Sequence, residues 1–260
     1  DTLNLGKISV GAPYFNAVFV PIMIPGVIAL AVFPYVRWKK DSLSRVFNLL
    51  KFEWICVALL TFLSWVFITD NVFVLVAFSL FIWVVNHVLV LFIKRLRSKA
   101  KLSMSFIGMI IAHLGIAVFV IGATVTTQLG IEKDIKMNIG ETQTIAGYDF
   151  VFNGVSPHSK ENYSGFIGNI SVFKNTKKVA QLSPEKRYYQ RGMPMTEASI
   201  DPSITRDLYV ALGEGLGGGA WSVRIYYKPL VRWIWLGGLM IALGALFAAI
   251  DRRYFLRIKS

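Results

Sequence analysis

Residues 109–122 read MIIAHLGIAVFVIG, and thirteen of these fourteen residues are apolar, the exception being His113. The apolar run extends over residues 104–127, which is long enough for one helix to cross a bilayer. Four further runs of similar length lie near residues 14–36, 52–69, 71–93 and 230–250. The sequence therefore predicts a membrane protein with a bundle of about five transmembrane α-helices.

Basic residues are concentrated beside these runs. The net charge is +13, and half of the 28 Lys and Arg residues fall in three short stretches, namely Arg37, Lys39, Lys40, Arg45 and Lys51; Lys94, Arg95, Arg97, Lys99 and Lys101; and Arg252, Arg253, Arg257 and Lys259. Residues 128–229 carry 12 basic and 10 acidic side chains and are nearly balanced. The excess charge thus predicts contact with membrane lipid and excludes nucleic acid as a partner.

The same stretches predict the orientation in the membrane. They follow the first, third and fifth apolar runs, and Lys and Arg are enriched on the cytoplasmic side. The section 128–229 is therefore expected outside, with the C-terminus in the cytoplasm. We predict a transmembrane bundle over residues 1–127, an outer domain over 128–229, and a last span with a cytoplasmic tail over 230–260.

The outer domain has the residue pattern of β structure. Apolar and polar residues alternate in YDFVFNGV (148–155), RDLYVAL (206–212) and WSVRIYYK (221–228), which predicts three strands. GEGLGG (213–218) matches the dinucleotide-binding fingerprint, but a strand follows it instead of a helix, so we interpret it as a hairpin turn. A small, mostly β domain is therefore predicted, as a sandwich or barrel inserted before the last span.

Two features predict how the helices pack. Pro21, Pro25 and Pro34 each remove a hydrogen-bond donor, so the first span is expected to be kinked or broken. Small residues allow helix backbones to approach closely, and they line one face of the fourth and fifth spans. The predicted stripes are Gly108, Ala112, Gly115 and Gly122 in the fourth span, and Gly238, Ala242, Ala245 and Ala249 in the fifth.

His113 lies roughly 13 Å into its span at the helical rise per residue, and an imidazole buried there needs a polar partner. A haem iron suits a neutral imidazole in an apolar slot. A structural histidine bonded to a neighbouring helix is the alternative, and the residue alone does not separate the two. His87 could share a ligand with His113, although its position near the basic border favours an interfacial anchor.

The stretch LSPEKRYYQRGMPMTEASI (182–200) is too polar for a core strand. Exposed methionines suit adaptable protein contacts, and arginines suit carboxylates such as haem propionates. We predict either a partner-docking surface or a loop that covers one edge of the β domain. The candidate docking residues are Glu185, Lys186, Arg187, Met193, Met195 and Glu197.

Six blocks of the sequence carry a resemblance to a known family. LGKISVGAPYFN, AHLGIAV, LSPEKRYY, MPMTEASI, RDLYVALGE and YYKPLVRWIWLGGLMIALG together resemble the C-terminal part of the CcmF family of cytochrome c maturation proteins, from about Leu5 to Arg253. The resemblance implies a bacterial inner-membrane haem lyase subunit with residues 128–229 in the periplasm. Its implied partners are a periplasmic haem chaperone, a haem lyase accessory subunit and apocytochrome c.

The resemblance also implies a haem b held by two membrane histidines, with His113 as one axial ligand. The family's other membrane histidine, its tryptophan-rich segment and two periplasmic histidines precede the matched region, so we expect a missing N-terminal part of the same protein. The leading hypothesis is that this chain helps reduce and transfer haem and is inactive in ligation by itself. The alternative is a non-catalytic scaffold that recruits haem lyase partners through its periplasmic domain.

Overall fold

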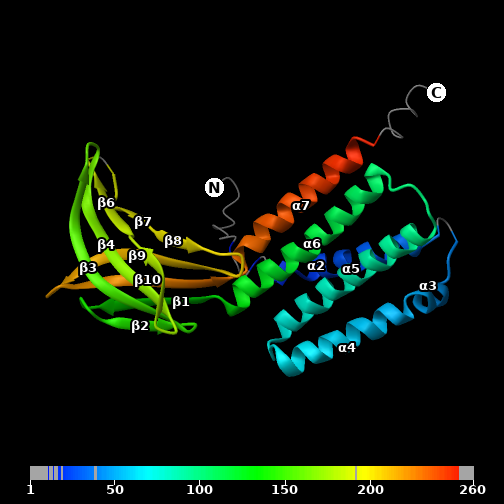
Figure 1. Cartoon of the computed structure of the whole chain (residues 1–260), viewed down its shortest axis with the longest axis horizontal. Helices are drawn as coiled ribbons and strands as arrows, with labels where there is room; N and C mark the ends of the chain where they lie inside the picture. The colour runs from blue at the N-terminus through cyan, green and yellow to red at the C-terminus, as the bar shows by residue number, and fades with distance from the viewer. Residues whose placement is uncertain are drawn as a thin grey trace, which may run out of the picture. The chain divides into compact units, whose positions relative to one another are not determined.

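The computed structural model describes residues 11, 14, 17–18, 20–37, 40–190 and 192–251. They belong to two compact units, a helical unit made of residues up to 121 and from 236 onward, and a β unit from Gly122 to Trp235 (Figure 1). The block LGKISVGAPYFN lies almost entirely outside the described residues. The basic stretch from Arg252 to Lys259 lies entirely outside them.

Apart from the short helix α3, the described helices follow the predicted apolar runs. They are α2 (Val20–Val32), the 3-10 helix η2 (Phe33–Tyr35), α3 (Leu43–Leu49), α4 (Lys51–Phe67), α5 (Val72–Arg97), α6 (Met104–Leu129) and α7 (Val231–Ala249). Among the described residues, α5, α6 and α7 are long and apolar enough to cross a membrane. The count of five is not confirmed, because α2 with η2 is shorter and α4 has 17 residues that include Lys51 and Glu53.

The first span is broken near one of its prolines. Pro25 lies inside α2, which ends at Val32, and Pro34 follows within the 3-10 turn η2. Proline has no amide hydrogen and crowds the preceding turn, so it ends a helix. The helix therefore ends before Pro34, which places Tyr35 just beyond α2, whereas α2 continues through Pro25.

Glycines bring the backbones of α6 and α7 together, as Figure 1 shows for the two neighbouring helices. A Cβ added at Gly115 would lie 2.8 Å from the carbonyl oxygen of Gly237, and one at Gly237 would lie 2.6 Å from that of Gly115. The predicted α6 stripe is confirmed at its three glycines. The predicted α7 stripe is wrong, because a Cβ at Gly238 would meet nothing within 4 Å, whereas Gly237 and Gly244 both face α6.

The inner helices share an apolar core. Val27 and Ala31 of α2 are buried in one cluster with Leu80, Trp83 and Val84 of α5. The Trp83 indole also donates a hydrogen bond to the carbonyl of Ile28 at 3.2 Å. Side chains on this face of α5 are therefore enclosed by neighbouring helices.

The β unit contains two antiparallel sheets. Its strands are β1 (Ile131–Met137), β2 (Thr142–Ile145), β3 (Tyr148–Lys160), β4 (Tyr163–Lys174), β5 (Lys177–Leu182), β6 (Glu185–Tyr189), β7 (Met195–Glu197), β8 (Ser199–Pro202), β9 (Arg206–Gly217) and β10 (Ala220–Pro229). One sheet has the order β1-β10-β9-β8, and the other has β2-β3-β4-β6-β7 with β5 beside β4. The three strands predicted from alternation are confirmed as parts of β3, β9 and β10.

The two sheets enclose one core. Phe150 and Phe152 of β3 and Leu208 and Val210 of β9 are fully buried in a single cluster that draws on both sheets. Alternate residues of a strand point to opposite faces, so the alternation seen in the sequence supplies this core. β9 and β10 form the predicted hairpin, but its turn is Gly218–Gly219, because residues 213–217 continue β9. Gly217, Gly218 and Gly219 have positive φ angles, which glycine adopts without strain.

The segment 182–200 differs from its prediction as a loop. It forms β6, which pairs with β4, then β7 at the edge of the same sheet, and then β8 in the other sheet. The polar residues are compatible with strands here because their charged groups pair with one another. The segment therefore joins the two sheets and is part of the fold.

Candidate functional site

His113 lies on α6 with a defined ring orientation. Its Nδ1 lies 2.8 Å from the carbonyl oxygen of Met109, one turn earlier on the same helix. A carbonyl can only accept, so Nδ1 carries the proton in this hydrogen bond and Nε2 of a neutral ring keeps its lone pair. The ring also interacts with the carbonyl of Leu30 on α2 and, electrostatically, with His87 on α5. His113 is thus positioned where three helices of the helical unit meet.

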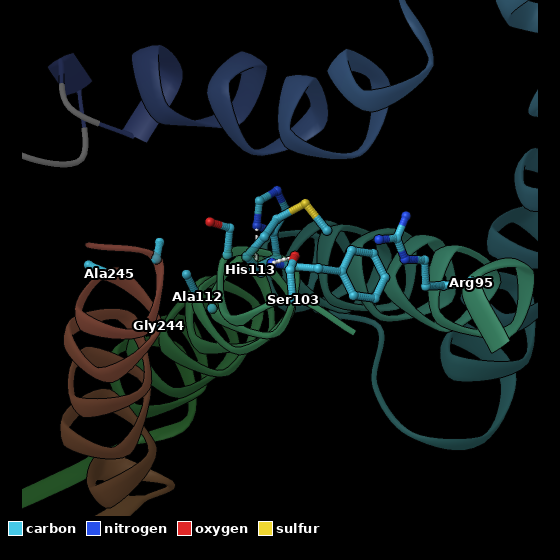
Figure 2. A pocket seen from close by; sticks show the side chains of 11 residues that line it. Arg95, Ser103, Ala112, His113, Gly244 and Ala245 are labelled. Atoms are coloured by element: carbon cyan, nitrogen blue, oxygen red, sulfur yellow. Dashed lines mark hydrogen bonds between the residues drawn. The ribbon is translucent and has the colours of Figure 1, made fainter. Parts of the chain in front are cut away.

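A pocket of about 540 Å³ opens beside this imidazole (Figure 2). Small residues of α6 and α7 form one side, while Phe106 and Met109 add larger apolar surface. Its lining residues are Arg95, Ser103, Ser105, Phe106, Gly108, Met109, Ala112, His113, Gly244, Ala245 and Ala248. The volume lies within the range of small-molecule sites, and such sites are mostly apolar with a few polar groups.

The residues of this pocket fit a haem. The imidazole offers one nitrogen lone pair as an axial ligand, and the apolar lining suits a macrocycle. Arg95 is the charged residue of the lining, and its guanidinium lies 5.3 Å from the Phe106 ring centre. An arginine there can pair with a carboxylate. Among the described residues, no group of three or more His, Cys, Asp or Glu side chains could hold a metal ion.

The His87 side chain is buried inside the helical unit and is not exposed as an anchor at the membrane–water interface would be. Its side chain is 0 % exposed, its Nδ1 lies 3.6 Å from Oε2 of Glu53, and its ring meets the Tyr35 ring edge-on at 5.1 Å. The expected interfacial anchor is therefore wrong, because α5 turns this face toward α2 and α4. Sequence reasoning missed Glu53 and Tyr35. The sequence did contain a signal for this site, because Glu53 is an acidic residue at the second position of the apolar run 52–69.

The charged residues among the predicted docking residues lie on β6 and β7, and their charges are paired. Arg187 contacts Glu185 at 2.7 Å and Glu197 at 3.3 Å, and Lys186 contacts Glu214 of β9 at 2.8 Å. The hydrogen bond from Arg187 holds the pKa of Glu185 below its ordinary value and raises the pKa of the guanidinium. Arg187 is thus already occupied by carboxylates of the chain itself.

The two methionines of this segment remain accessible. Met193 is 88 % exposed and Met195 is 51 % exposed. Both lie in or just before β7, the edge strand of the six-stranded sheet. Flexible, polarizable methionine side chains suit contacts with more than one partner surface. The structure therefore leaves the apolar part of the predicted docking surface exposed.

The paired carboxylates predict how the stability of the β unit depends on pH. Lys186 and Arg187 lower the pKa values of Glu214 and Glu185 below the ordinary 4.5. A pKa lowered by folding gives stability above the unfolded value, which is lost as pH falls through the folded value. We expect the free energy of unfolding to decline below pH 4.5 and to be nearly constant at neutral pH. Urea unfolding of the intact protein, followed by β-sheet circular dichroism, measures this decline, and Glu214→Gln should reduce it. An equal decline in that variant would contradict the assignment.

Comparisons with known proteins agree with this fold. A family model described as the CcmF C-terminal beta-sandwich matches residues 128–229. The chain is 43 % identical to the cytochrome c-type biogenesis protein CcmF of Pseudomonas aeruginosa, and the match covers 100 % of the chain and 41 % of that protein. It is 41 % identical to CcmF of Escherichia coli strain K12, over 98 % of the chain and 40 % of that protein.

A solved structure shares the fold as well. The protein titled cytochrome c haem lyase CcmF superposes with a TM-score of 0.79 at 18 % identity, over 93 % of this chain and 41 % of that one. The chain spans about two fifths of the length of the relatives that it matches. Together, the family model, the curated relatives and the structural neighbour show that this chain belongs to the CcmF family and corresponds to its C-terminal part.

Proposed function

We propose that the protein carrying this chain is a haem lyase subunit of c-type cytochrome biogenesis, and that the chain contributes a haem b site at His113. Its relatives are named cytochrome c-type biogenesis proteins, and a structural neighbour is titled a haem lyase. The chain itself is that of a multi-pass membrane protein. The proposal assigns this part of the molecule to haem reduction and transfer, not to ligation by itself.

The observation that carries the haem proposal is the setting of the His113 ring. Its Nδ1 lies against the Met109 carbonyl and the ring lines the pocket, so Nε2 is the nitrogen that would ligate iron in this proposal. An imidazole ligates iron in its neutral form, and an apolar setting suits that form. One-electron reduction is the chemistry that a haem b supplies at such a site. The protein's part is to hold, orient and desolvate the group.

The proposed orientation in the membrane follows from the distribution of charge. Lys94, Arg95 and Arg97 end α5 and mark the cytoplasmic side by the positive-inside rule. The β unit then lies in the periplasm of a bacterial inner membrane, with the C-terminus in the cytoplasm. In that position it can meet a periplasmic haem chaperone, an accessory subunit and apocytochrome c. The N-terminal part of the same protein supplies the second haem ligand in this proposal.

His113→Ala tests the haem assignment. In the complete protein purified from membranes, we expect this substitution to remove the b-type absorbance, because alanine cannot ligate iron. Free imidazole added to His113→Gly should restore part of the absorbance. His158→Ala is the matched control, since His158 lies on β3 in the β unit, and it should retain the full spectrum. An unchanged spectrum in His113→Ala would contradict the proposal and leave the scaffold hypothesis, in which His113 is structural.

A further inference from the structure

Two ionisable side chains are buried together between α4 and α5. Glu53 is 4 % exposed and His87 is 0 % exposed, and the closest distance between their polar atoms is 3.6 Å. This separation is longer than a hydrogen bond. In the described part of the chain, Oε2 of Glu53 and both ring nitrogens of His87 have no hydrogen-bond partner. The haem proposal for His113 uses neither residue.

A row of polar groups connects this pair to the basic end of α5. The Tyr35 hydroxyl donates a hydrogen bond to Oε1 of Glu53 at 3.1 Å. The Lys94 ammonium donates to the same hydroxyl at 3.5 Å and lies 4.9 Å from the centre of the Tyr35 ring. Lys94 is in the last turn of α5, where the basic residues cluster. The row therefore runs from the buried carboxylate toward the exposed end of the helix.

Other charged groups around the pair have their own partners or act at longer range. Arg45 of α3 binds the backbone carbonyl of Tyr35 at 2.9 Å and pairs with Asp41. His113 of α6 interacts electrostatically with His87. No acidic side chain other than Glu53 faces His87 among the described residues. Glu53 and His87 are therefore each other's nearest candidates for charge compensation.

Because Glu53 and His87 are buried, the free-energy cost of their charges depends on whether the pair holds a proton. An ionised carboxylate taken out of water without a paired charge is very costly, and so is a buried polar atom without a partner. One proton makes the pair neutral, whether it resides on Glu53 beside a neutral imidazole or on His87 beside a carboxylate. Intramembrane ionisable groups of this kind commonly serve as proton relays. The geometry provides two bases for one proton and a hydroxyl that leads toward the aqueous face.

We propose that Glu53 and His87 form a proton-binding site that exchanges its proton with the basic face of the membrane bundle through Tyr35. This function goes beyond the haem proposal and does not require a haem. Its consequence for the neighbouring pocket is electrostatic, because a proton bound near His87 makes the potential at His113 more positive. Glu53 and His87 share the proton, and the Tyr35 hydroxyl is hydrogen-bonded to Glu53 on the side of the basic residues.

Labelling with dicyclohexylcarbodiimide in membranes containing the complete protein tests the proposal. This apolar reagent reacts with protonated carboxyl groups, as the carboxyl oxygen adds to the central carbon and the proton moves to nitrogen. We expect an adduct on Glu53, identified by peptide mass. The yield should fall as the pH of labelling rises, because only the protonated carboxyl reacts. Asp251 is the internal control, since it is also buried (5 %) but accepts a hydrogen bond from the Ser105 amide at 2.8 Å and should remain unlabelled.

Two variants complete the test. Glu53→Gln should abolish the adduct, and His87→Phe should raise its yield at a given pH, because the carboxyl loses the second base that competes for the proton. Absence of the Glu53 adduct at every pH would overturn the proposal, as would labelling that does not depend on pH or an unchanged yield in His87→Phe. Labelling should persist in His113→Ala, so this result is independent of the haem assignment.

Discussion

Gly237→Ala is expected to lower the thermal stability of the protein strongly, although alanine is the better helix former. The added Cβ would lie 2.6 Å from the carbonyl oxygen of Gly115 and 2.6 Å from the amide nitrogen of Phe119. Both are backbone atoms of α6, so only a shift of one helix relieves the overlap. Overpacking of this kind costs about 1–3 kcal/mol, which exceeds the gain of about 1 kcal/mol from helix propensity.

The adjacent glycine provides a matched control. A Cβ at Gly238 would meet nothing within 4 Å, so Gly238→Ala should be neutral or slightly stabilising. Thermal unfolding of the complete protein in detergent measures both variants, and we expect Gly237→Ala to lose roughly 4 °C or more. Because α7 also lines the pocket through Gly244, the b-type spectrum should change only in Gly237→Ala. Equal melting temperatures for the two variants would show that α6 and α7 do not pack as described.

Gly165→Ala is expected to disrupt the β unit. Gly165 lies on β4 opposite Arg187 of β6, and an added Cβ would overlap the carbonyl oxygen of Lys186. The neighbouring atoms belong to the β6 backbone, so this strand has to move away from β4. β7 is the edge strand beside β6 and should separate with it. We expect a large fraction of the protein to misfold, because core overpacking that no side chain can relieve is strongly destabilising.

Hydrogen–deuterium exchange of the intact protein measures this effect strand by strand. Amides of β6 and β7 should exchange much faster in Gly165→Ala, together with a lower yield of purified protein. Gly215→Ala is the control in the same unit, since its Cβ would contact the Trp221 ring at an ordinary 3.6 Å and should leave exchange unchanged. Slow exchange in β6 of Gly165→Ala would contradict the described β4–β6 approach.

Helices and strands with a strong hydrophobic pattern could be predicted from the sequence. Phe150 and Phe152, like Leu208 and Val210, recur at every second position, and this period of two identified the strands whose alternate residues form the core. Continuous apolar runs likewise identified α5, α6 and α7. Single adjacent residues could not be assigned in this way. Gly237 and Gly238 differ by about 100° around a helix, and only the position of α6 decides which one faces it.

The candidate site was predictable only where one residue contrasted with its surroundings. His113 is the polar exception in an apolar run, so the sequence singled it out. The sequence alone did not show whether its partner is a haem iron or a neighbouring helix. The buried pair of Glu53 and His87 depends on two helices that meet in three dimensions. The strands of segment 182–200 depend on Arg187 neutralising carboxylates from neighbouring positions. The number of polar residues in a segment does not show which of them pair in the folded protein.

The double ion pair of Arg187 has a consequence for how partners would associate with the β unit. Because Glu185 and Glu197 already satisfy the guanidinium, docking at this edge would gain little from opposite charges on a partner. The binding free energy would come from apolar contacts of Met193 and Met195. Dissolved salt screens interactions between charges and has little effect on such contacts. Association at this edge should therefore be nearly insensitive to ionic strength, and its dissociation rate, not its encounter rate, should set the affinity.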